Sequence, residues 1–126
     1  MPKTPRITEA EWTVMRVIWK KHPITASEVV GALSGTTDWS PKTIKTLITR
    51  LANKGVLSYV TEGRTFVFSP TVSEEESLER ESETFLTRFF GGSVNPLIAH
   101  FIERGKLSQE EVDELRAILR RKGKRS

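Results

Sequence analysis

The stretch SPKTIKTLITRLANKG, residues 40–55, decides the fold because both of its ends carry clear helix signals. Ser40 is a favourable N-cap residue and Pro41 suits the first helical position, whereas Gly55 suits the left-handed residue that follows a helix. Apolar residues recur three and four positions apart, at Ile44, Leu47, Ile48 and Leu51. The stretch therefore predicts a complete helix with one face against a core.

The opposite face of this predicted helix carries only cations, hydroxyls and an amide. These residues are Lys42, Thr43, Lys45, Thr46, Thr49, Arg50 and Asn53. The stretch contains no acid, although a solvated helix face usually mixes charges of both signs. Such a face suits a DNA major groove, where Lys and Arg reach phosphate or guanine and Thr methyl groups meet thymine. We therefore predict DNA contacts from this face, the alternative being an ordinary amphipathic core helix.

The N-terminus of the same helix is a second candidate contact. Its first amides lack helical partners, and the positive end of the helix dipole lies there. A DNA phosphate beside Ser40 and Thr43 would satisfy both. We therefore add Ser40 to the predicted DNA-binding residues.

Charge is unevenly distributed along the 126 residues, although the net charge is only +4. Residues 1–70 contain ten basic and five acidic side chains, whereas residues 71–114 contain four basic and eleven acidic ones. Residues 116–126 contain six basic side chains and no acidic ones. The basic first part suits a nucleic acid, and the acidic middle part suits a protein partner. The length suits one domain, or one small domain with an appended module.

Several classes of function find no support in the sequence. There is no cysteine, which excludes disulfides and thiolate metal sites. We find no phosphate-binding glycine-rich loop, no cluster of metal ligands and no Ser, His and Asp set typical of a triad, so we predict neither an enzyme nor a cofactor or metal. The N-terminus lacks an apolar signal region, and no apolar run approaches the roughly 20 residues that span a bilayer. We therefore expect a cytoplasmic protein without membrane insertion.

Two shorter helices are predicted before residue 40, each with a capping box. Thr8 with Glu11 begins the first, which should extend to about residue 21, and Thr25 with Glu28 begins the second, which Gly35 should end.

A β-hairpin is predicted after the helix of residues 40–55. Two runs rich in β-branched and aromatic residues, 56–61 and 64–69, are joined around Glu62 and Gly63. Three helices followed by a hairpin is the order of a winged helix-turn-helix, which we assign to residues 1–71. The wing tip would place Arg64 against a DNA phosphate, although a solvated turn residue is an equal alternative.

Residues 72–126 show helical patterns only, and we predict three helices there. Ser73 with Glu76 begins the first, the pair Asn95-Pro96 the second, and Ser108 with Glu111 the third, while the basic tail from residue 120 should fray. Their large apolar residues exceed what so small a module buries alone. The predicted dimerisation residues are Leu78, Phe85, Phe89, Leu97, Phe101, Ile102, Val112, Leu115 and Leu119.

The predicted fold class is mainly α with a small β-hairpin, made of an N-terminal winged helix-turn-helix and a C-terminal three-helix dimerisation domain, residues 72–126. An intertwined homodimer would set two reading helices about one turn apart on a palindromic operator in double-stranded DNA. The alternative is that the last helices fold back on the winged-helix core.

The chain resembles the BlaI/MecI family of penicillinase repressors over nearly its whole length. The resemblance rests on Glu11-Trp12 with Met15 and Trp19, on residues 38–51, on Gly91-Gly92, and on residues 107–115. It implies a dimeric bacterial repressor with a winged helix and a helical dimerisation domain, bound to palindromic operators of β-lactam resistance genes. It also implies DNA contacts at Lys42, Thr43, Thr46 and Arg50.

The resemblance further implies how such a repressor is released. Members of the family are proteolysed when a membrane receptor senses a β-lactam, and the cleaved bond is an Asn-Phe pair in the first helix after the double glycine. This sequence has His100-Phe101 at that place, so it differs at the residue before the bond.

Two other interpretations remain open from the sequence. A winged helix can serve protein assembly without binding DNA, with the acidic helical half as the working surface. A repressor of this family can also answer a signal other than a β-lactam.

Overall fold

The computed structural model describes residues 6–125, which pack as two compact units that divide inside one helix, between Glu81 and Ser82. This division lies beyond the boundary predicted between residues 71 and 72. The beginning of the dividing helix packs with the first unit, since Ser77 is only 2% exposed.

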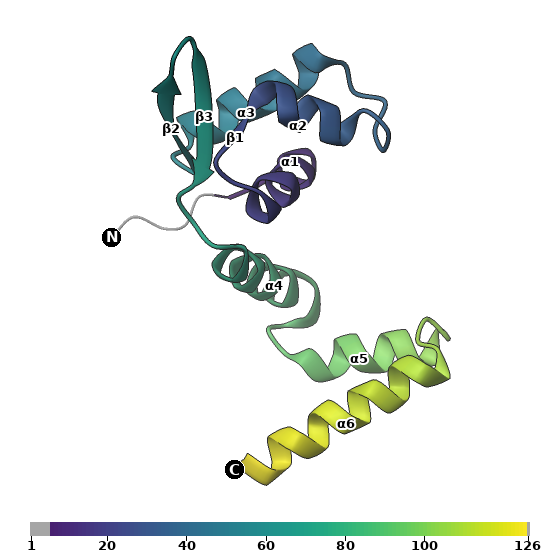
Figure 1. Ribbon diagram of the computed structural model, residues 1–126. Helices are drawn as coiled ribbons and strands as arrows, with labels where there is room; N and C mark the ends of the chain where they lie inside the picture. Colours follow the sequence, from purple (N-terminus) through teal and green to yellow (C-terminus); the bar gives the residue numbers. More distant parts are fainter. Residues whose placement is uncertain (1–5, 126) are drawn as a thin grey trace. The chain divides into compact units, whose positions relative to one another are not determined.

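The first unit contains three helices and three short strands (Figure 1). They are α1 (Glu9–Lys20), β1 (Ile24–Thr25), α2 (Ala26–Leu33), α3 (Pro41–Asn53), β2 (Leu57–Glu62) and β3 (Thr65–Pro70). The strands form an antiparallel sheet in the order β1-β3-β2, with Val60 opposite Val67 in the hairpin. The predicted fold class is confirmed. Strand β1 was not predicted, because two residues are too few to show an alternating pattern.

Capping signals placed the starts of α1 and α2 correctly. In both helices the N-cap threonine accepts from the backbone N–H three residues on, and the glutamate there accepts from the N-cap N–H, so Thr8 with Glu11 and Thr25 with Glu28 are complete capping boxes. The position of the end of α2 was also predicted correctly, because the helix ends at Leu33 with Ser34 as its C-cap and Gly35 follows. Gly35 does not adopt the left-handed conformation that is common at this position.

Helix α3 has the two ends that its sequence predicts. The Ser40 hydroxyl accepts from the Thr43 N–H at 3.1 Å, and Pro41 is the first helical residue. At the other end Gly55 has φ 84°, a conformation in which a side chain would be strained. These two signals fix the length of the helix.

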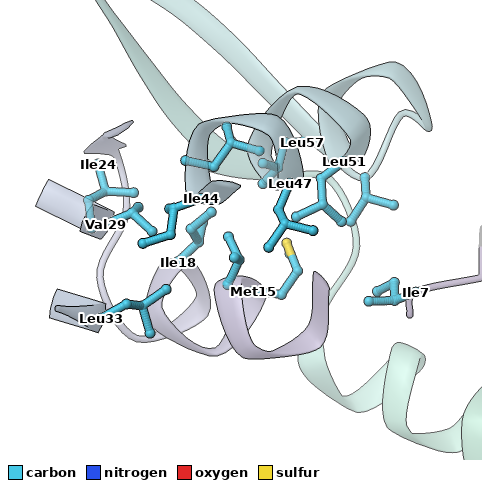
Figure 2. Packing of buried hydrophobic residues seen from close by; sticks show 13 residues of the cluster. Ile7, Met15, Ile18, Ile24, Val29, Leu33, Ile44, Leu47, Leu51 and Leu57 are labelled. Carbon is cyan, nitrogen blue, oxygen red and sulfur yellow. The ribbon is translucent and has the colours of Figure 1, made fainter. Parts of the chain in front are cut away.

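The core of the first unit lies between α1, α2, α3 and the base of the sheet. Figure 2 shows Met15 and Ile18 of α1 pointing toward Ile44 and Leu47 of α3, and none of these four side chains is more than 5% exposed. The whole apolar stripe of α3 is buried, as the spacing predicts. Fully burying one such side chain stabilises the fold by about 1.5–3 kcal/mol. Packing therefore fixes which face of α3 remains outside.

An ion pair with a buried carboxylate adds a directed contact between α1 and α3, since the Glu11 side chain is 2% exposed and the Lys54 side chain is 34% exposed. The Glu11 carboxylate accepts from Lys54 Nζ at 2.5 Å, and Lys54 is the C-cap residue of α3. Burial alone would raise the pKa of Glu11, but hydrogen bonds from Lys54 and Thr8 outweigh it and lower that pKa below its usual value of 4.5. The pair therefore stabilises the fold above pH 4.5, and this contribution is lost as the pH falls through the lowered pKa.

The remaining helices are α4 (Glu74–Phe90), α5 (Val94–Glu103) and α6 (Gln109–Arg125). Gly91 and Gly92 have φ angles of 62° and 82° and separate α4 from α5, as predicted. The predicted fraying of the basic tail was wrong for the described residues, because α6 continues to Arg125; Ser126 lies outside them.

The described part of the second unit has no buried core of its own, since none of its side chains from residue 82 to residue 122 is buried. Large apolar side chains remain open to solvent there, among them Phe89 at 60% and Ile102 at 52% exposed. Within residues 6–125, no helix combines the length and the apolar character that a bilayer crossing requires.

Candidate nucleic-acid interface

The outer face of α3 brings the predicted DNA-binding residues together. Six of them, Lys42, Thr43, Lys45, Thr46, Thr49 and Arg50, are exposed on this one helix. All except Thr43 line a shallow, open hollow along the helix. The face is therefore accessible over its length, and its shape and charge suit a double helix better than a small molecule.

Two threonines on this face have their hydroxyl hydrogens already engaged. Thr46 Oγ1 donates to the Lys42 carbonyl at 2.9 Å, and Thr49 Oγ1 donates to the Lys45 carbonyl at 3.0 Å. A hydroxyl whose hydrogen is used retains lone pairs, so it can still accept from an amino group of adenine or cytosine. The methyl groups remain available for thymine. The sequence predicted contacts at these positions but gave no sign of this internal bonding.

The N-terminus of α3 is capped by its own side chains. Besides accepting from the Thr43 N–H, the Ser40 hydroxyl lies 3.0 Å from the Thr43 hydroxyl. Both residues are exposed. The first turn of the helix thus presents a small polar platform at the positive end of the dipole, where a phosphate is favoured.

The cations of this face are not neutralised inside the protein. Where side chains are described, residues 6–122, neither Lys42, Lys45 nor Arg50 forms an ion pair. Helix α3 itself contains no acid. Their positive charge is therefore available to a polyanion.

Arg64 lies at the tip of the wing, where the sequence placed it. The two-residue turn between β2 and β3 is made of Gly63 and Arg64, with φ 63° at the glycine and no positive φ at the arginine, which fits a type II′ turn. Arg64 is exposed and its guanidinium forms no ion pair with any described residue. The turn therefore holds a cation at the end of a stiff hairpin.

Two aromatic side chains of the wing were not singled out from the sequence. Tyr59 and Phe66 are 56% and 53% exposed, and their rings meet edge to face with centroids 5.2 Å apart. They lie on adjacent strands of the hairpin, and the period-two pattern of a strand could have indicated their outward direction. They stiffen the wing that carries Arg64.

The predicted dimerisation residues are wholly or partly open in the single chain. Leu97, Val112 and Leu115 are partly buried, whereas the other members of the set are exposed. Three rings gather at one end of α5, with His100 lying 6.3 Å from Phe90 and 5.8 Å from Phe101 between ring centroids. The candidate cleavage residues His100 and Phe101 are both exposed.

A metal site is not formed by the described residues. No group of three or more His, Asp or Glu side chains converges there.

A second hollow is lined by two aromatic residues, Trp12 and Trp39, together with Glu9, Ala10, Thr13 and Arg16.

Comparison with protein families gives a match over almost the whole chain. A family model described as "Penicillinase repressor" matches residues 7–121. The penicillinase repressor of Bacillus licheniformis is 46% identical over 119 residues, which cover 94% of this chain and 93% of that protein. The methicillin resistance regulatory protein MecI of Mammaliicoccus sciuri is 39% identical over 120 residues, which cover 95% of this chain and 98% of that protein.

Two solved structures resemble the first part of the chain. The solution structure of the DNA-binding domain of the repressor BlaI superposes with a TM-score of 0.54 at 49% identity, covering 60% of this chain and 93% of that one. The Bacillus licheniformis BlaI monomeric form in complex with the blaP half-operator gives a TM-score of 0.53 with the same identity and coverage.

Replacing Arg50 or Lys42 by alanine tests the predicted interface. If Arg50 contacts a base edge, Arg50→Ala should weaken binding to a specific duplex by about 1–3 kcal/mol. If Lys42 contacts a phosphate, Lys42→Ala should weaken all duplexes alike and reduce the salt slope by about 1. Fluorescence anisotropy with labelled DNA at several salt concentrations measures both effects.

The matched control for these variants is Lys20→Ala, which removes an exposed cation from α1. It should leave affinity and salt slope nearly unchanged. Wild-type affinity in both Arg50→Ala and Lys42→Ala would contradict the assignment of this face to DNA.

Proposed function

Because this chain belongs to the penicillinase repressor family, we propose that it represses transcription by inserting α3 into the major groove of operator DNA. The observation that carries this proposal is the exposed, acid-free outer face of α3, with its uncompensated cations and threonines. Its relatives are named as a penicillinase repressor and a methicillin resistance regulator. We accordingly assign to this chain the control of β-lactam resistance or related genes.

The chemistry of the interface divides between affinity and specificity. Lysines at the rim of the groove neutralise phosphates and release counterions, which gives affinity on any sequence. Arg50, Thr46 and Thr49 lie farther along the same face and supply a bidentate donor, acceptors and methyl groups for base edges. Arg64 adds a phosphate contact from the wing. This arrangement binds and reads DNA and requires no catalytic group.

A homodimer is the form in which we expect the protein to act. The second unit exposes large apolar residues on all three of its helical segments and buries none of its described side chains up to residue 122. A second copy would cover this surface, because so small a set of helices rarely folds without a partner. Two linked heads would then bind a palindrome, the second contact becoming intramolecular and adding about 10²–10⁴-fold in affinity.

Release from DNA would follow cleavage within this dimerisation unit. The His100-Phe101 bond lies inside α5. The His100 carbonyl accepts from the Arg104 N–H at 3.1 Å, and the Phe101 carbonyl accepts from the Lys106 N–H at 2.9 Å. A protease needs an extended backbone, so α5 must open locally before the bond can be cut. Cleavage there would remove the gain from dimerisation while leaving α3 intact.

Salt dependence of duplex binding tests the central proposal. The full-length protein should bind DNA from upstream of its own gene, and log affinity should fall steeply and linearly with log salt because several phosphates are contacted. A footprint on the same DNA should show two protected half-sites related by a two-fold axis. A protein-assembly module would instead show little binding at any salt concentration, which would contradict the proposal.

Substitution of Phe101 tests the dimer. Phe101→Asp should place a charge in the apolar interface, shift the protein to monomer and reduce affinity for a full palindrome by about 10²–10⁴-fold, with little effect on a half-site. Analytical ultracentrifugation and anisotropy measure the two effects. Asn95→Asp, which adds the same charge at an exposed position of α5, is the control. An unchanged oligomeric state in Phe101→Asp would place that residue outside the interface.

The cleavage proposal is tested in cells of the native host exposed to a β-lactam. Mass spectrometry should find fragments ending at His100 and beginning at Phe101. His100→Asn, which restores the residue that the family resemblance implies before the bond, should be cleaved at least as fast. Loss of DNA binding with an intact chain, or a cut elsewhere, would contradict this mode of release.

A further inference from the structure

A single carboxylate oxygen joins three segments of the first unit. Oε1 of Glu11 accepts from the Thr8 N–H at 2.9 Å and from Lys54 Nζ at 2.5 Å. Lys54 Nζ also donates to the carbonyl of Arg6 at 3.1 Å. The segment before α1, the first turn of α1 and the C-terminal end of α3 therefore converge on Glu11.

The capping role of Glu11 does not explain its burial. Glu28 has the same position in the capping box of α2 and also pairs with a lysine, Lys21, at 3.1 Å. Its side chain is nevertheless 45% exposed, whereas that of Glu11 is 2% exposed. Two chemically equivalent boxes in one chain thus differ in whether the carboxylate is buried, and the lysine partners are 34% exposed at Lys54 and 69% exposed at Lys21. The cap itself needs no buried charge.

Burying the carboxylate of this pair is not an efficient way to gain stability. Its desolvation offsets much of its attraction to the lysine, and replacement of such a pair by apolar groups is often neutral or stabilising. The pair does impose direction, since its atoms must meet with hydrogen-bond geometry. Its best use is therefore to select one arrangement among several that apolar packing would tolerate.

In this protein, the arrangement that the ion pair can select is the orientation of α3 on α1. The helix rests on α1 through an apolar stripe, and such contacts permit small rotations and shifts at little cost in free energy. Lys54 follows the last helical residue and is four positions after Arg50, so it lies next to the DNA-reading face without being part of it. A contact at this point limits rotation of α3 about its axis and sliding along it.

We propose that Glu11 and Lys54 are a positioning pair that fixes the orientation of α3 for sequence-specific DNA recognition. Base contacts tolerate only small displacements, whereas phosphate contacts made by long, flexible lysines tolerate larger ones. Loss of the pair should therefore reduce discrimination between sequences more than it reduces total DNA binding. This inference rests on the proposed function, because its main measurement is operator preference.

Four single substitutions in the full-length protein test the proposal. Glu11→Gln removes the charge but retains an oxygen that can accept from the Thr8 N–H, and Lys54→Met removes the ammonium group but retains much of the stem. Glu28→Gln and Lys21→Met are the same changes in the exposed pair and serve as matched controls. Circular dichroism and thermal unfolding first establish that each variant is folded at the assay temperature.

The main measurement is the ratio of affinities for the footprinted site and for a scrambled duplex of equal length. Glu11→Gln and Lys54→Met should lower this ratio by about tenfold, and the double variant should lose no more than either single variant. The two controls should stay within about twofold of the wild type. Adding Glu11→Gln to Lys54→Met should not restore the affinity ratio, because the double variant still lacks the ammonium donor at position 54.

A second measurement does not depend on DNA. Residual dipolar couplings of backbone amides report the angle between α1 and α3, which should change in Glu11→Gln and stay constant in Glu28→Gln. Unchanged couplings together with an unchanged affinity ratio would overturn the proposal and leave Glu11 a purely structural residue. Equal losses on both duplexes would also overturn it. A wild type that shows no operator preference would refute the proposed function, and the dipolar couplings would still decide this inference.

Discussion

The packing of one apolar stripe of α3 against α1 is the contact on which the rest of the molecule depends. An α-helix repeats every 3.6 residues, so burying one stripe determines which residues face outward. The four buried side chains of α3 contribute several kcal/mol together at about 1.5–3 kcal/mol each. The outward residues contribute little to stability, which leaves them free to carry charge for DNA. The side chains that stabilise the fold and those that we propose contact DNA thus occupy opposite faces of the same thirteen residues.

Local signals predicted most of this arrangement, and long-range contacts account for what they missed. The N-cap at Ser40, the proline after it and the glycine at position 55 act within a few residues, so the ends of α3 follow from the sequence. The pair between Glu11 and Lys54 joins positions 43 residues apart, and no sequence spacing indicates it. Strand β1 exists because β3 lies beside it, and its two residues show no pattern alone. The candidate DNA face was predictable because it is the complement of a periodic stripe.

The second unit shows the limit of the same reasoning. Its helices carry apolar periodicity, and at the start of α6 Ser108 with Glu111 forms the predicted reciprocal bonds. Periodicity tells which residues require cover but does not tell what covers them. In the first unit the cover comes from the same chain, whereas the described side chains of residues 82–122 remain unburied. Whether a periodic apolar face is covered by its own chain is therefore visible only once the chain has folded.

The proposed DNA-reading face of α3 combines fixed and mobile groups in a way that suits the two tasks of binding and recognising DNA. Thr46 and Thr49 have hydroxyl hydrogens bonded to the carbonyls one turn earlier, so their rotamers are restricted before DNA arrives. Ordering such side chains on binding costs little entropy, which favours selective contacts to bases. Lys42 and Lys45 retain long, unpaired side chains that can follow phosphates of any sequence. A protein that must first find DNA and then recognise one site gains from keeping these two kinds of group on one rigid helix.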